Sequence, residues 1–584
     1  MLRWGLLAST AVTYLATACP TVLGGDNGEF STLLHDGGVA HPPGYPAYTL
    51  WLRLFGLIPT FSPAHGAAMA TALLGVAAVM MLRQACIETG ASELAATVAA
   101  GVFAFSPLAW DLATHAEVFA LNALLAAAIM TLASPRSSLS AERRAPLLAA
   151  VAGLGLANHH SIVLMIGTGA VGFVIAVLST SHRLRTLAVS LAALALGLTP
   201  YAYTYLQGAV HDGRWVWGET STLPGLLHHV MRADYGTTRL ALADQPTQPL
   251  AQLSFLGIHL LEASLFVLAP VVLLGLVVAL RPPRDGARAA WWVRASIALS
   301  FVLSGPLFVS LFNIAPTGTG RHVVERFHLL PWACLVPFLA VGMDALLARL
   351  PARTSVRHGA GLLGVVAAFA LHLPQQRQSA SPVVEDYLRN TLAAAPPHAV
   401  ILGSGDMELF GFLYADRALG LRPDVTFLDP VMMLYPWYHR RLSAQLAVDL
   451  VHPVGKSLPL GALIRQLMSS GHPVLLAAEL DSRALGAFTI YPLGPLLVVE
   501  PGDRQPPSPA ELEARNLRIA AGYQVHGGFS TDPNSWEASA QRAYARPWRE
   551  LARTWMAAGM SVDAERDRQR AALFLPWRHG SNRD

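Results

Sequence analysis

The chain has 584 residues, of which 53% are hydrophobic and only 13% are charged. Soluble globular proteins carry roughly 25% charged residues, so the composition excludes an ordinary soluble protein and predicts a polytopic α-helical membrane protein. The net charge of +4 comes without a basic cluster interleaved with aromatic residues, so nucleic acid is not an expected partner.

Eleven segments approach the length of a spanning helix, which needs about 20 mostly apolar residues. They are 5–23, 63–83, 94–109, 117–134, 146–158, 160–180, 186–205, 253–280, 291–314, 327–349 and 357–373. The fifth segment is short, so residues 146–180 form either two spans or a re-entrant hairpin. Residues 1–23 also have features of a signal peptide, but the cleavage site before Cys19 is poor, and we favour a retained first helix.

Arginine residues gather in every second connection between these segments. With the N-terminus inside, the inner connections hold Arg3, Arg83, Arg136, Arg143, Arg144, Arg183, Arg185, Arg281, Arg284, Arg288, Arg294, Arg349, Arg353 and Arg357. Cytoplasmic loops carry an excess of Lys and Arg, so we expect this side to be cytoplasmic. An odd number of spans then places residues 374–584 outside, which is the periplasmic side of a bacterial inner membrane.

Two carboxylates, Asp26 and Glu29, directly follow the first apolar segment. Three residues apart, they share a face if the segment is helical, and an ionisable group at a membrane boundary is a functional candidate. Asp26 would suit a general base that takes a proton from an acceptor hydroxyl, with Glu29 orienting it or holding a metal. Alternatively, Asp26 or Asn27 caps a helix that begins near Gly28.

Further polar residues follow on the same outer side. His41 and Tyr45 lie in a Pro-rich turn, where they either bind a sugar or only support the turn. Glu117 lies between the third and fourth segments, and its spacing from the nearby histidine does not match a zinc helix motif. The neighbouring histidines of Asn158-His159-His160 would point in different directions on a helix. We therefore expect these three residues to hydrogen-bond a polar ligand or a loop, and a divalent metal is possible but not indicated.

Two arginines of the outer loops are candidates for contact with an anionic lipid carrier. Arg321 and Arg326 precede the tenth segment, and a guanidinium grips phosphate as a planar fork. The alternative is ordinary loop salt bridges. In the loop of residues 206–252, Trp217 and Tyr235 either line a sugar site or anchor the loop at the membrane interface.

The composition changes from about residue 374. Four short apolar stretches, 400–403, 425–428, 473–476 and 496–499, predict buried strands beside helical segments. We therefore expect three domains: a transmembrane domain over 1–373, a periplasmic α/β domain over 374–503 and a helical region over 504–584. Within the last, residues 548–572 predict a helix–turn–helix pair similar to one tetratricopeptide unit.

Several motifs resemble those of one family in the same order. The stretches 26–30, 41–46, 116–124, 155–160, 217–219, 234–237 and 326–327 are similar to signatures of the DUF2723 family of TMEM260-like protein O-mannosyltransferases. The resemblance covers about residues 20–350. Asn27 stands where serine is common in the family motif, which leaves both carboxylates in place.

The resemblance implies a GT-C glycosyltransferase with its active site on the non-cytoplasmic face. Such enzymes move a sugar, here a hexose with mannose favoured, from a polyprenyl-phosphate carrier to a hydroxyl of an exported protein or glycan, usually with inversion. The family's general base corresponds to Asp26 with Glu29 as its partner, and its donor or phosphate contacts correspond to His41 and Arg326. No cofactor is implied with certainty.

Two other functions compete with the enzyme. A transporter or flippase of lipid-linked sugars would place charges near the bilayer midplane and often shows paired internal repeats, whereas the polar residues of this chain gather on one side. A binding module on a membrane anchor would not need eleven spans. The sequence therefore favours the glycosyltransferase, with residues 374–584 expected to recognise the acceptor.

Overall fold

The computed structural model describes residues 2–59, 62–210, 212–236, 246–283, 288–349, 354–455, 457–477 and 485–577. Thr237, Arg284 and Arg353, named above, lie outside these residues. The chain forms two compact units. Unit 1 comprises Met1–Cys19, Gly37–Phe61 and His65–Ala380, and unit 2 comprises Pro20–Asp36, Ser62–Ala64 and Ser381–Asp584.

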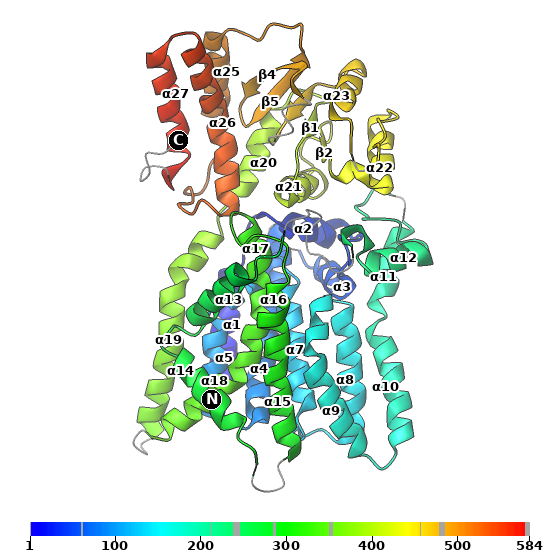
Figure 1. Ribbon diagram of the computed structural model, residues 1–584, viewed down its shortest axis with the longest axis vertical. Helices are drawn as coiled ribbons and strands as arrows, with labels where there is room; N and C mark the ends of the chain where they lie inside the picture. Colours follow the sequence, from blue (N-terminus) through cyan, green and yellow to red (C-terminus); the bar gives the residue numbers. More distant parts are fainter. Residues whose placement is uncertain are drawn as a thin grey trace. The chain divides into compact units, whose positions relative to one another are not determined.

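Unit 1 is helical throughout its regular structure (Figure 1). Its α-helices are α1 (Leu2–Ala16), α3 (Pro46–Phe55), α4 (Pro63–Thr89), α5 (Glu93–Ala104), α6 (Pro107–Thr114), α7 (Phe119–Ala133), α8 (Ala141–Leu156), α9 (Ile166–Leu178), α10 (Arg183–Gly197), α11 (Pro200–Gly208), α12 (Leu223–Val230), α13 (Pro249–Ala263), α14 (Ala269–Ala279), α15 (Arg288–Val302), α16 (Phe308–Ser310), α17 (Gly320–Glu325), α18 (Leu329–Leu347) and α19 (Thr354–Ser379). Short helical turns join them at η1 (His160–Met165), η2 (Ala233–Tyr235), η3 (Leu303–Leu307) and η4 (Arg326–His328).

Five stretches of the described chain are long and apolar enough to cross a membrane. They are Pro63–Thr89, His160–Leu178, Arg183–Gly208, Arg288–Ser310 and Gly320–Leu347. A sixth results if α5 and α6, which meet at a bend of 65°, are one broken span. Each of the eleven expected segments contains a helix, so the membrane class is supported, while the number of eleven spans stays a prediction.

Two expected spans are broken in the structure: 94–109 falls on α5 and α6 at their bend, and 253–280 is interrupted as well. The segment 253–280 forms two helices, α13 and α14, instead of one. The break falls at Leu265 and Phe266, whose φ angles of 54° and 57° are left-handed and cannot continue a right-handed helix. An apolar pattern alone does not reveal such a break.

Glycines allow the closest helix crossings of unit 1. A Cβ on Gly153 of α8 would overlap the carbonyl oxygen of Leu194 on α10, and one on Gly275 of α14 would overlap that of Phe338 on α18. Small residues at such crossings let helix backbones approach in a membrane, where no hydrophobic effect drives helices together. Beyond the arginines of its first turn, the exposed side chains of α10 are apolar, for example Leu187 and Leu191, as expected for a surface that faces lipid.

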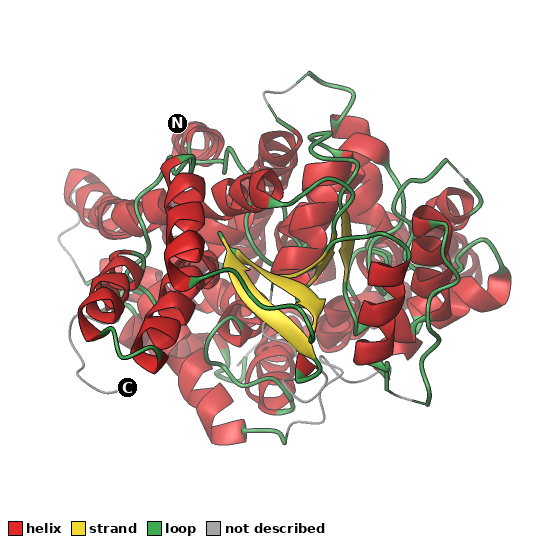
Figure 2. Cartoon of the chain, turned by 90° about the horizontal axis from the view of Figure 1, so that it is seen from above, coloured by secondary structure: helices red, strands yellow, loops and turns green. Residues whose placement is uncertain are grey.

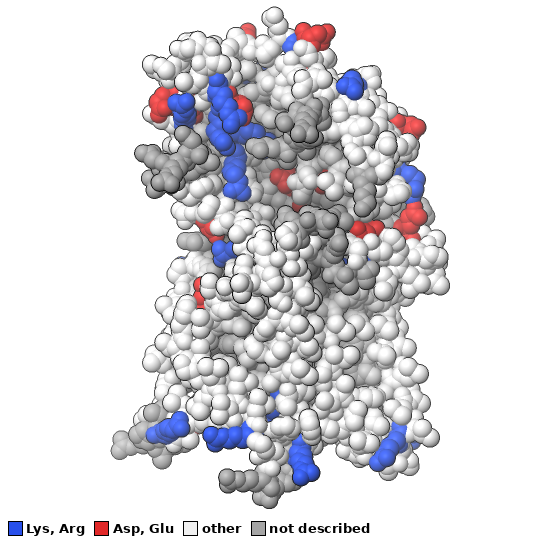
Figure 3. Space-filling view, viewed as in Figure 1, with Lys and Arg blue, Asp and Glu red and all other residues white. Residues whose placement is uncertain are grey.

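The charges of unit 1 are unevenly distributed. The face seen in Figure 3 shows basic residues at the lower end of the helices and, above them, a band almost without charge. Helices α10 and α15 begin at Arg183 and Arg288, and Figure 1 shows both helices starting at that lower end. This pattern agrees with the arginine-rich connections that the sequence places on the cytoplasmic side.

Unit 2 contains a five-stranded sheet, drawn in yellow in Figure 2. Its strands are β1 (Val400–Leu402), β2 (Thr426–Leu428), β3 (Val474–Leu476), β4 (Phe488–Leu493) and β5 (Leu496–Pro501), in the order β2-β1-β3-β5-β4. The first three strands are parallel, and β5 pairs antiparallel with β3 and β4. All four stretches that the sequence marks as strands are strands, and β4 is an additional one.

Helices accompany the sheet within unit 2. They are α20 (Val383–Ala394), α21 (Asp406–Arg417), η5 (Met432–Leu434), α22 (Pro436–Leu446), α23 (Leu460–Ser469), α25 (Pro509–Ala521), α26 (Trp536–Ala557) and α27 (Ser561–Leu573). The expected helix–turn–helix pair is the contact of α26 with α27, with Gly559 in the turn at φ 78°. Unit 2 also includes α2 (Asn27–Asp36), which lies some 380 positions before α21 in the sequence and packs directly against it.

Candidate active site

Residues 20–36, here called the carboxylate segment, fold as part of unit 2. Helix α2 begins at Asn27, and the carbonyl oxygen of Asp26 accepts a hydrogen bond from the Phe30 N–H at 3.1 Å. Asp26 therefore occupies the N-cap position and Glu29 the first turn, where the helix dipole stabilises negative charge. The backbone hydrogen bond expected of an N-cap residue is thus made by Asp26, and both carboxylates lie at the same helix end.

Short polar contacts fix this helix end locally. The side-chain oxygen of Asn27 accepts a hydrogen bond from the Leu23 N–H at 3.1 Å, so Asn27 closes the turn that precedes Asp26. One turn later the Ser31 and Thr32 hydroxyls bond to the carbonyl oxygens of Asn27 and Gly28. Asp26 and Glu29 are 5% and 0% exposed. Asn27 thus has a structural role that serine, with its shorter side chain, would perform differently.

Unit 1 contains a second group, which joins four predicted residues to two phenylalanines and which we call the ring cluster: Trp217, His41, Tyr45, His159, Phe119 and Phe327. Successive ring centres lie between 5.0 and 6.1 Å apart. The Tyr45 hydroxyl lies 2.9 Å from Nε2 of His41, and the Tyr45 ring stacks on that of His159 at an interplanar angle of 20°. Aromatic faces joined by hydrogen-bonding groups are suited to bind a sugar ring.

The Pro-rich turn places Tyr45 in an unusual conformation. Tyr45 is the N-cap of α3 and has φ 45° and ψ 46°, a left-handed conformation that costs a non-glycine residue about 1–2 kcal/mol. Residues held in such conformations concentrate at functional sites, because the surrounding structure has to maintain them. A backbone bridge between Val39 and Val216 brings Trp217 to the same turn.

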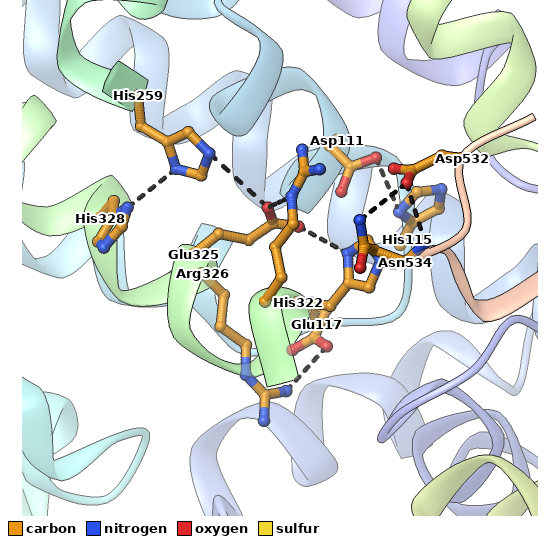
Figure 4. A network of polar contacts seen from close by, with 11 residues as sticks. Asp111, His115, Glu117, His259, His322, Glu325, Arg326, His328, Asp532 and Asn534 are labelled. Atoms are coloured by element: carbon orange, nitrogen blue, oxygen red, sulfur yellow. Dashed lines mark hydrogen bonds and ion pairs between the residues drawn. The ribbon is translucent and has the colours of Figure 1, made fainter. Parts of the chain in front are cut away.

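Arg326 and Glu117 form an ion pair (Figure 4) beside Phe119, near one end of the ring cluster. An Arg326 N–H donates to Oε1 of Glu117 at 3.2 Å, and the guanidinium carbon lies 5.6 Å from the centre of the Phe119 ring. The two side chains are 15% and 14% exposed, so the pair places a largely buried positive charge beside the rings. A guanidinium can bridge a carboxylate and a phosphate because its donors form a planar fork.

Two buried histidines of this region, His159 and His229, are uncharged near neutral pH. Burial lowers the pKa of His159 well below its usual range, and the positive charges of Arg232 and Arg326 lower it further. Burial likewise lowers the pKa of His229, which lies beside Gly44, to about 3. Neutral imidazoles hydrogen-bond hydroxyl groups but do not balance a phosphate charge, so that role would fall to arginine.

Arg321 takes part in a different set of contacts around Glu325, which Figure 4 labels. Glu325 lies 3.3 Å from Nε of Arg321, 2.7 Å from Nδ1 of His322 and 3.8 Å from Nε2 of His259. Nδ1 of His259 in turn lies 2.9 Å from Nδ1 of His328. The structure therefore separates the two candidate arginines: Arg326 adjoins the rings, and Arg321 pairs with a carboxylate of its own helix.

The remaining predicted residues have structural contacts. The Asn158 amide donates to the Val118 carbonyl oxygen at 3.2 Å, and Nε2 of His160 lies 3.2 Å from the Tyr201 hydroxyl. His159 and His160 thus point to different partners, as expected for neighbours. Tyr235 lies under the Arg232 guanidinium at 5.3 Å, outside the ring cluster.

Sequence reasoning missed several residues of the site. Phe119, Phe327 and Asp234 lie inside stretches that carry the family resemblance, and the Trp217 indole N–H donates to Asp234 at 3.2 Å. Their place in those stretches was a usable signal, whereas nothing in the sequence points to His229. In the described residues, no three His, Cys, Asp or Glu side chains are placed to hold a metal ion.

Known proteins with related sequences carry the name expected from the motifs. Residues 26–183 match the family described as the protein O-mannosyl-transferase TMEM260 N-terminal domain. The chain is 29% identical to protein O-mannosyl-transferase TMEM260 of Mus musculus over 485 residues, covering 78% of this chain and 67% of the mouse protein. It is 25% identical to the Dictyostelium discoideum protein of that name, covering 74% of this chain and 57% of the relative.

A solved structure shares the fold. The crystal structure of ArnT from Cupriavidus metallidurans bound to undecaprenyl phosphate superposes with a TM-score of 0.52 at 12% identity, covering 86% of this chain and 98% of ArnT. The resemblance inferred from the motifs is thereby confirmed, as is the expected class, a GT-C glycosyltransferase similar to the O-mannosyltransferases.

Proposed function

Because the chain resembles the TMEM260 protein O-mannosyltransferases over most of its length, we propose that it transfers mannose from a polyprenyl-phosphate carrier to a hydroxyl of an exported protein. The observation that carries the proposal is the ring cluster ending at the ion pair of Arg326 with Glu117. It joins surfaces for a sugar to a cation for a phosphate.

The donor would contact unit 1. Its sugar would lie against Tyr45 and Trp217, with the imidazoles of His41 and His159 as hydrogen-bonding partners for its hydroxyls. The carrier phosphate would bind Arg326, which is held in place by Glu117. The attraction between this buried arginine and the phosphate increases as the phosphate gains charge in the transition state. Electrostatic attraction is larger where water is excluded.

Asp26 of the carboxylate segment would be the base. Asp26 accepts the proton of the acceptor hydroxyl while that oxygen attacks the anomeric carbon, and the bond from this carbon to the phosphate oxygen breaks. The leaving group is the polyprenyl phosphate, which keeps the bonding electrons. A single displacement inverts the anomeric centre. Glu29, one helical turn from Asp26, would orient the base or the acceptor.

The membrane orientation follows from charge. The basic lower end of unit 1 (Figure 3) would face the cytoplasm by the positive-inside rule. The ring cluster would then lie on the opposite face, and the expected odd number of spans would put residues 374–584 on that side too, which is the periplasm in a bacterial cell. That face suits a lipid-linked donor, because no nucleotide is required there.

Product analysis tests this proposal. The full chain in vesicles is supplied with polyprenyl-phosphate mannose labelled in the sugar and with a secreted protein, and mass spectrometry reads the acceptor. We expect a hexose on serine or threonine in the wild type and none with Asp26→Asn. Asp212→Asn, which changes an exposed loop carboxylate paired with Arg214, should behave as wild type.

The same assay separates the alternative function. A flippase would move the labelled lipid across the vesicle membrane without transferring its sugar. Transport without any sugar on protein would therefore overturn the proposal. Transfer of mannose from a nucleotide-linked donor, with the lipid-linked donor inactive, would overturn its donor assignment.

A further inference from the structure

The carboxylate segment is separated in sequence from the unit with which it folds. Residues 20–36 and 62–64 group with residues 381–584, whereas residues 37–61 group with the helices of unit 1. The Ser62 hydroxyl donates to the Pro20 carbonyl oxygen at 2.9 Å, which joins the two short stretches. The first outer loop thus leaves unit 1 after Cys19, contributes a helix to unit 2 and then returns.

Two glycines set the packing of this segment. A Cβ on Gly28 would overlap the carbonyl oxygen of Phe410 on α21, and a Cβ on Gly24 would overlap the indole ring of Trp536 at the start of α26. A carbonyl oxygen inside a helix cannot move aside, so Gly28 permits an approach that no other residue allows. These two positions flank Asp26, and Gly28 directly precedes Glu29.

Polar contacts fix the two ends of the segment. The Val22 N–H donates to a carboxylate oxygen of Glu385 on α20 at 3.1 Å. At the other end, Nε and a terminal nitrogen of Arg417 on α21 lie 2.8 and 2.7 Å from Oδ2 of Asp36, the last residue of α2. The side chains of Arg417 and Asp36 are 31% and 14% exposed, so water screens this ion pair only in part.

We propose that unit 2 positions the carboxylates for the reaction, with Arg417, Glu385 and Trp536 as positioning residues. The functional part of this inference rests on the proposed function, in which Asp26 is the base. Unit 2 is then part of the catalytic apparatus, in addition to any acceptor recognition. A base shifted by about 1 Å can lower a rate by about 100-fold, so loss of these contacts affects chemistry before donor binding.

A charge swap tests the positioning role in the full chain. Arg417→Asp and Asp36→Arg should each lower kcat about 10-fold or more while KM for polyprenyl-phosphate mannose stays within about twofold. The double variant, which restores an ion pair of opposite polarity, should recover most of kcat, and Arg417→Lys should retain more activity than Arg417→Asp. With kcat referred to the amount of folded protein, a loss of folded chain alone would leave kcat unchanged, whereas a misplaced base lowers it.

The matched control is another ion pair of unit 2. Arg566 lies 2.8 Å from Glu513, with side chains 42% and 13% exposed, but it contacts no residue of the carboxylate segment. Arg566→Asp should leave kcat within about twofold. If Arg417→Asp reduces kcat no more than Arg566→Asp does, or if the swap restores nothing, the inference is overturned.

Hydrogen exchange gives a readout that does not depend on activity. Arg417→Asp should speed amide exchange in residues 20–36 at least about 10-fold, leave residues 37–61 unchanged and be reversed by the swap. If the variants show this pattern of exchange but the wild type transfers no mannose, the proposed function fails and the packing of residues 20–36 against unit 2 stands. If exchange in residues 20–36 is unaltered, or if 37–61 responds equally, the positioning inference fails whatever the activity. Arg417→Gln serves if the charge reversal does not fold.

Discussion

The two halves of the first outer loop are held by different forces. Residues 20–36 are fixed by close backbone packing at Gly28 and by the ion pair of Asp36 with Arg417. Residues 37–61 are fixed by ring stacking between Tyr45 and His159 and by the bridge of Val39 to Val216. One continuous motif therefore serves two units: its first half presents acids on a helix end, and its second half presents rings.

This difference predicts how variants will divide. Changes in the ring cluster or at Arg326 should alter how the donor binds and leaves. Changes in the carboxylate segment should alter the chemical step while donor binding persists. If variants of either half change KM for the donor and kcat to the same extent, the distinction between the two halves has no functional meaning.

Apart from the proposed base itself, the largest effect is expected for Arg326→Ala. Removing one preorganised donor to a developing anion costs about 10²–10³ in kcat, and KM for the lipid donor should also rise because the guanidinium would contact the ground-state phosphate. Steady-state kinetics with labelled polyprenyl-phosphate mannose measures both. Arg232→Ala, which removes the guanidinium over Tyr235, should have a much smaller effect, and an equal one would contradict the assignment of the phosphate contact.

Gly28→Val should come next. The new side chain would meet the Phe410 carbonyl oxygen and push α2 away from α21, so we expect kcat to fall about 100-fold with little change in donor KM. Gly5→Val is the control, since nothing lies within 4 Å of a Cβ there. Unchanged kcat in Gly28→Val would show that the packing of α2 is not needed for chemistry.

Tyr45→Phe probes the ring half more gently. It keeps the stacked ring but removes the hydroxyl that lies 2.9 Å from His41, a hydrogen bond worth about 1 kcal/mol, or roughly fivefold. That loss should raise donor KM more than it lowers kcat. Tyr14→Phe, which removes a buried hydroxyl bonded to the Ala104 carbonyl oxygen, should leave donor KM unchanged, and an equal rise in both would contradict a specific role.

The smallest effect concerns stability and pH. Burial raises the pKa of Glu408, on α21, from its ordinary 4.5 to about 7, helped by the charges of Asp429 and Asp406 and opposed by Arg546. The folded chain therefore binds the proton more tightly than the unfolded chain, and stability falls as pH rises from about 4.5 to 7. Glu408→Gln should raise Tm by about 1–3 °C at pH 8 and hardly at pH 4.5. A constant difference at both pH values would contradict this.

Helices and strands can be predicted from the sequence, whereas the packing between segments far apart in the chain cannot. Four strands of unit 2 were predicted because short β-branched runs lie between turn residues, and the Asp26–Glu29 helix end was predicted from spacing alone. Nothing in the motif shows that Gly24 and Gly28 meet Trp536 and Phe410, because those partners lie more than 380 positions away.

The same limit applies to the candidate site. His41, Tyr45, His159 and Trp217 were chosen for their chemistry, and the structure shows that their rings form a continuous series. The sequence did not distinguish Arg326 from Arg321, since both precede one helix, and only their partners Glu117 and Glu325 separate them. Roles set by long-range partners require the fold.

The most direct test of the proposed chemistry compares Asp26→Asn with Glu29→Gln in one single-turnover assay of mannose transfer. With Asp26 as general base, Asp26→Asn should lower the rate by about 10²–10⁴ at unchanged donor affinity, and Glu29→Gln should lower it less. If Asp26→Asn keeps the wild-type rate, or if Glu29→Gln loses more, then Asp26 only caps α2 and the base has been assigned to the wrong carboxylate.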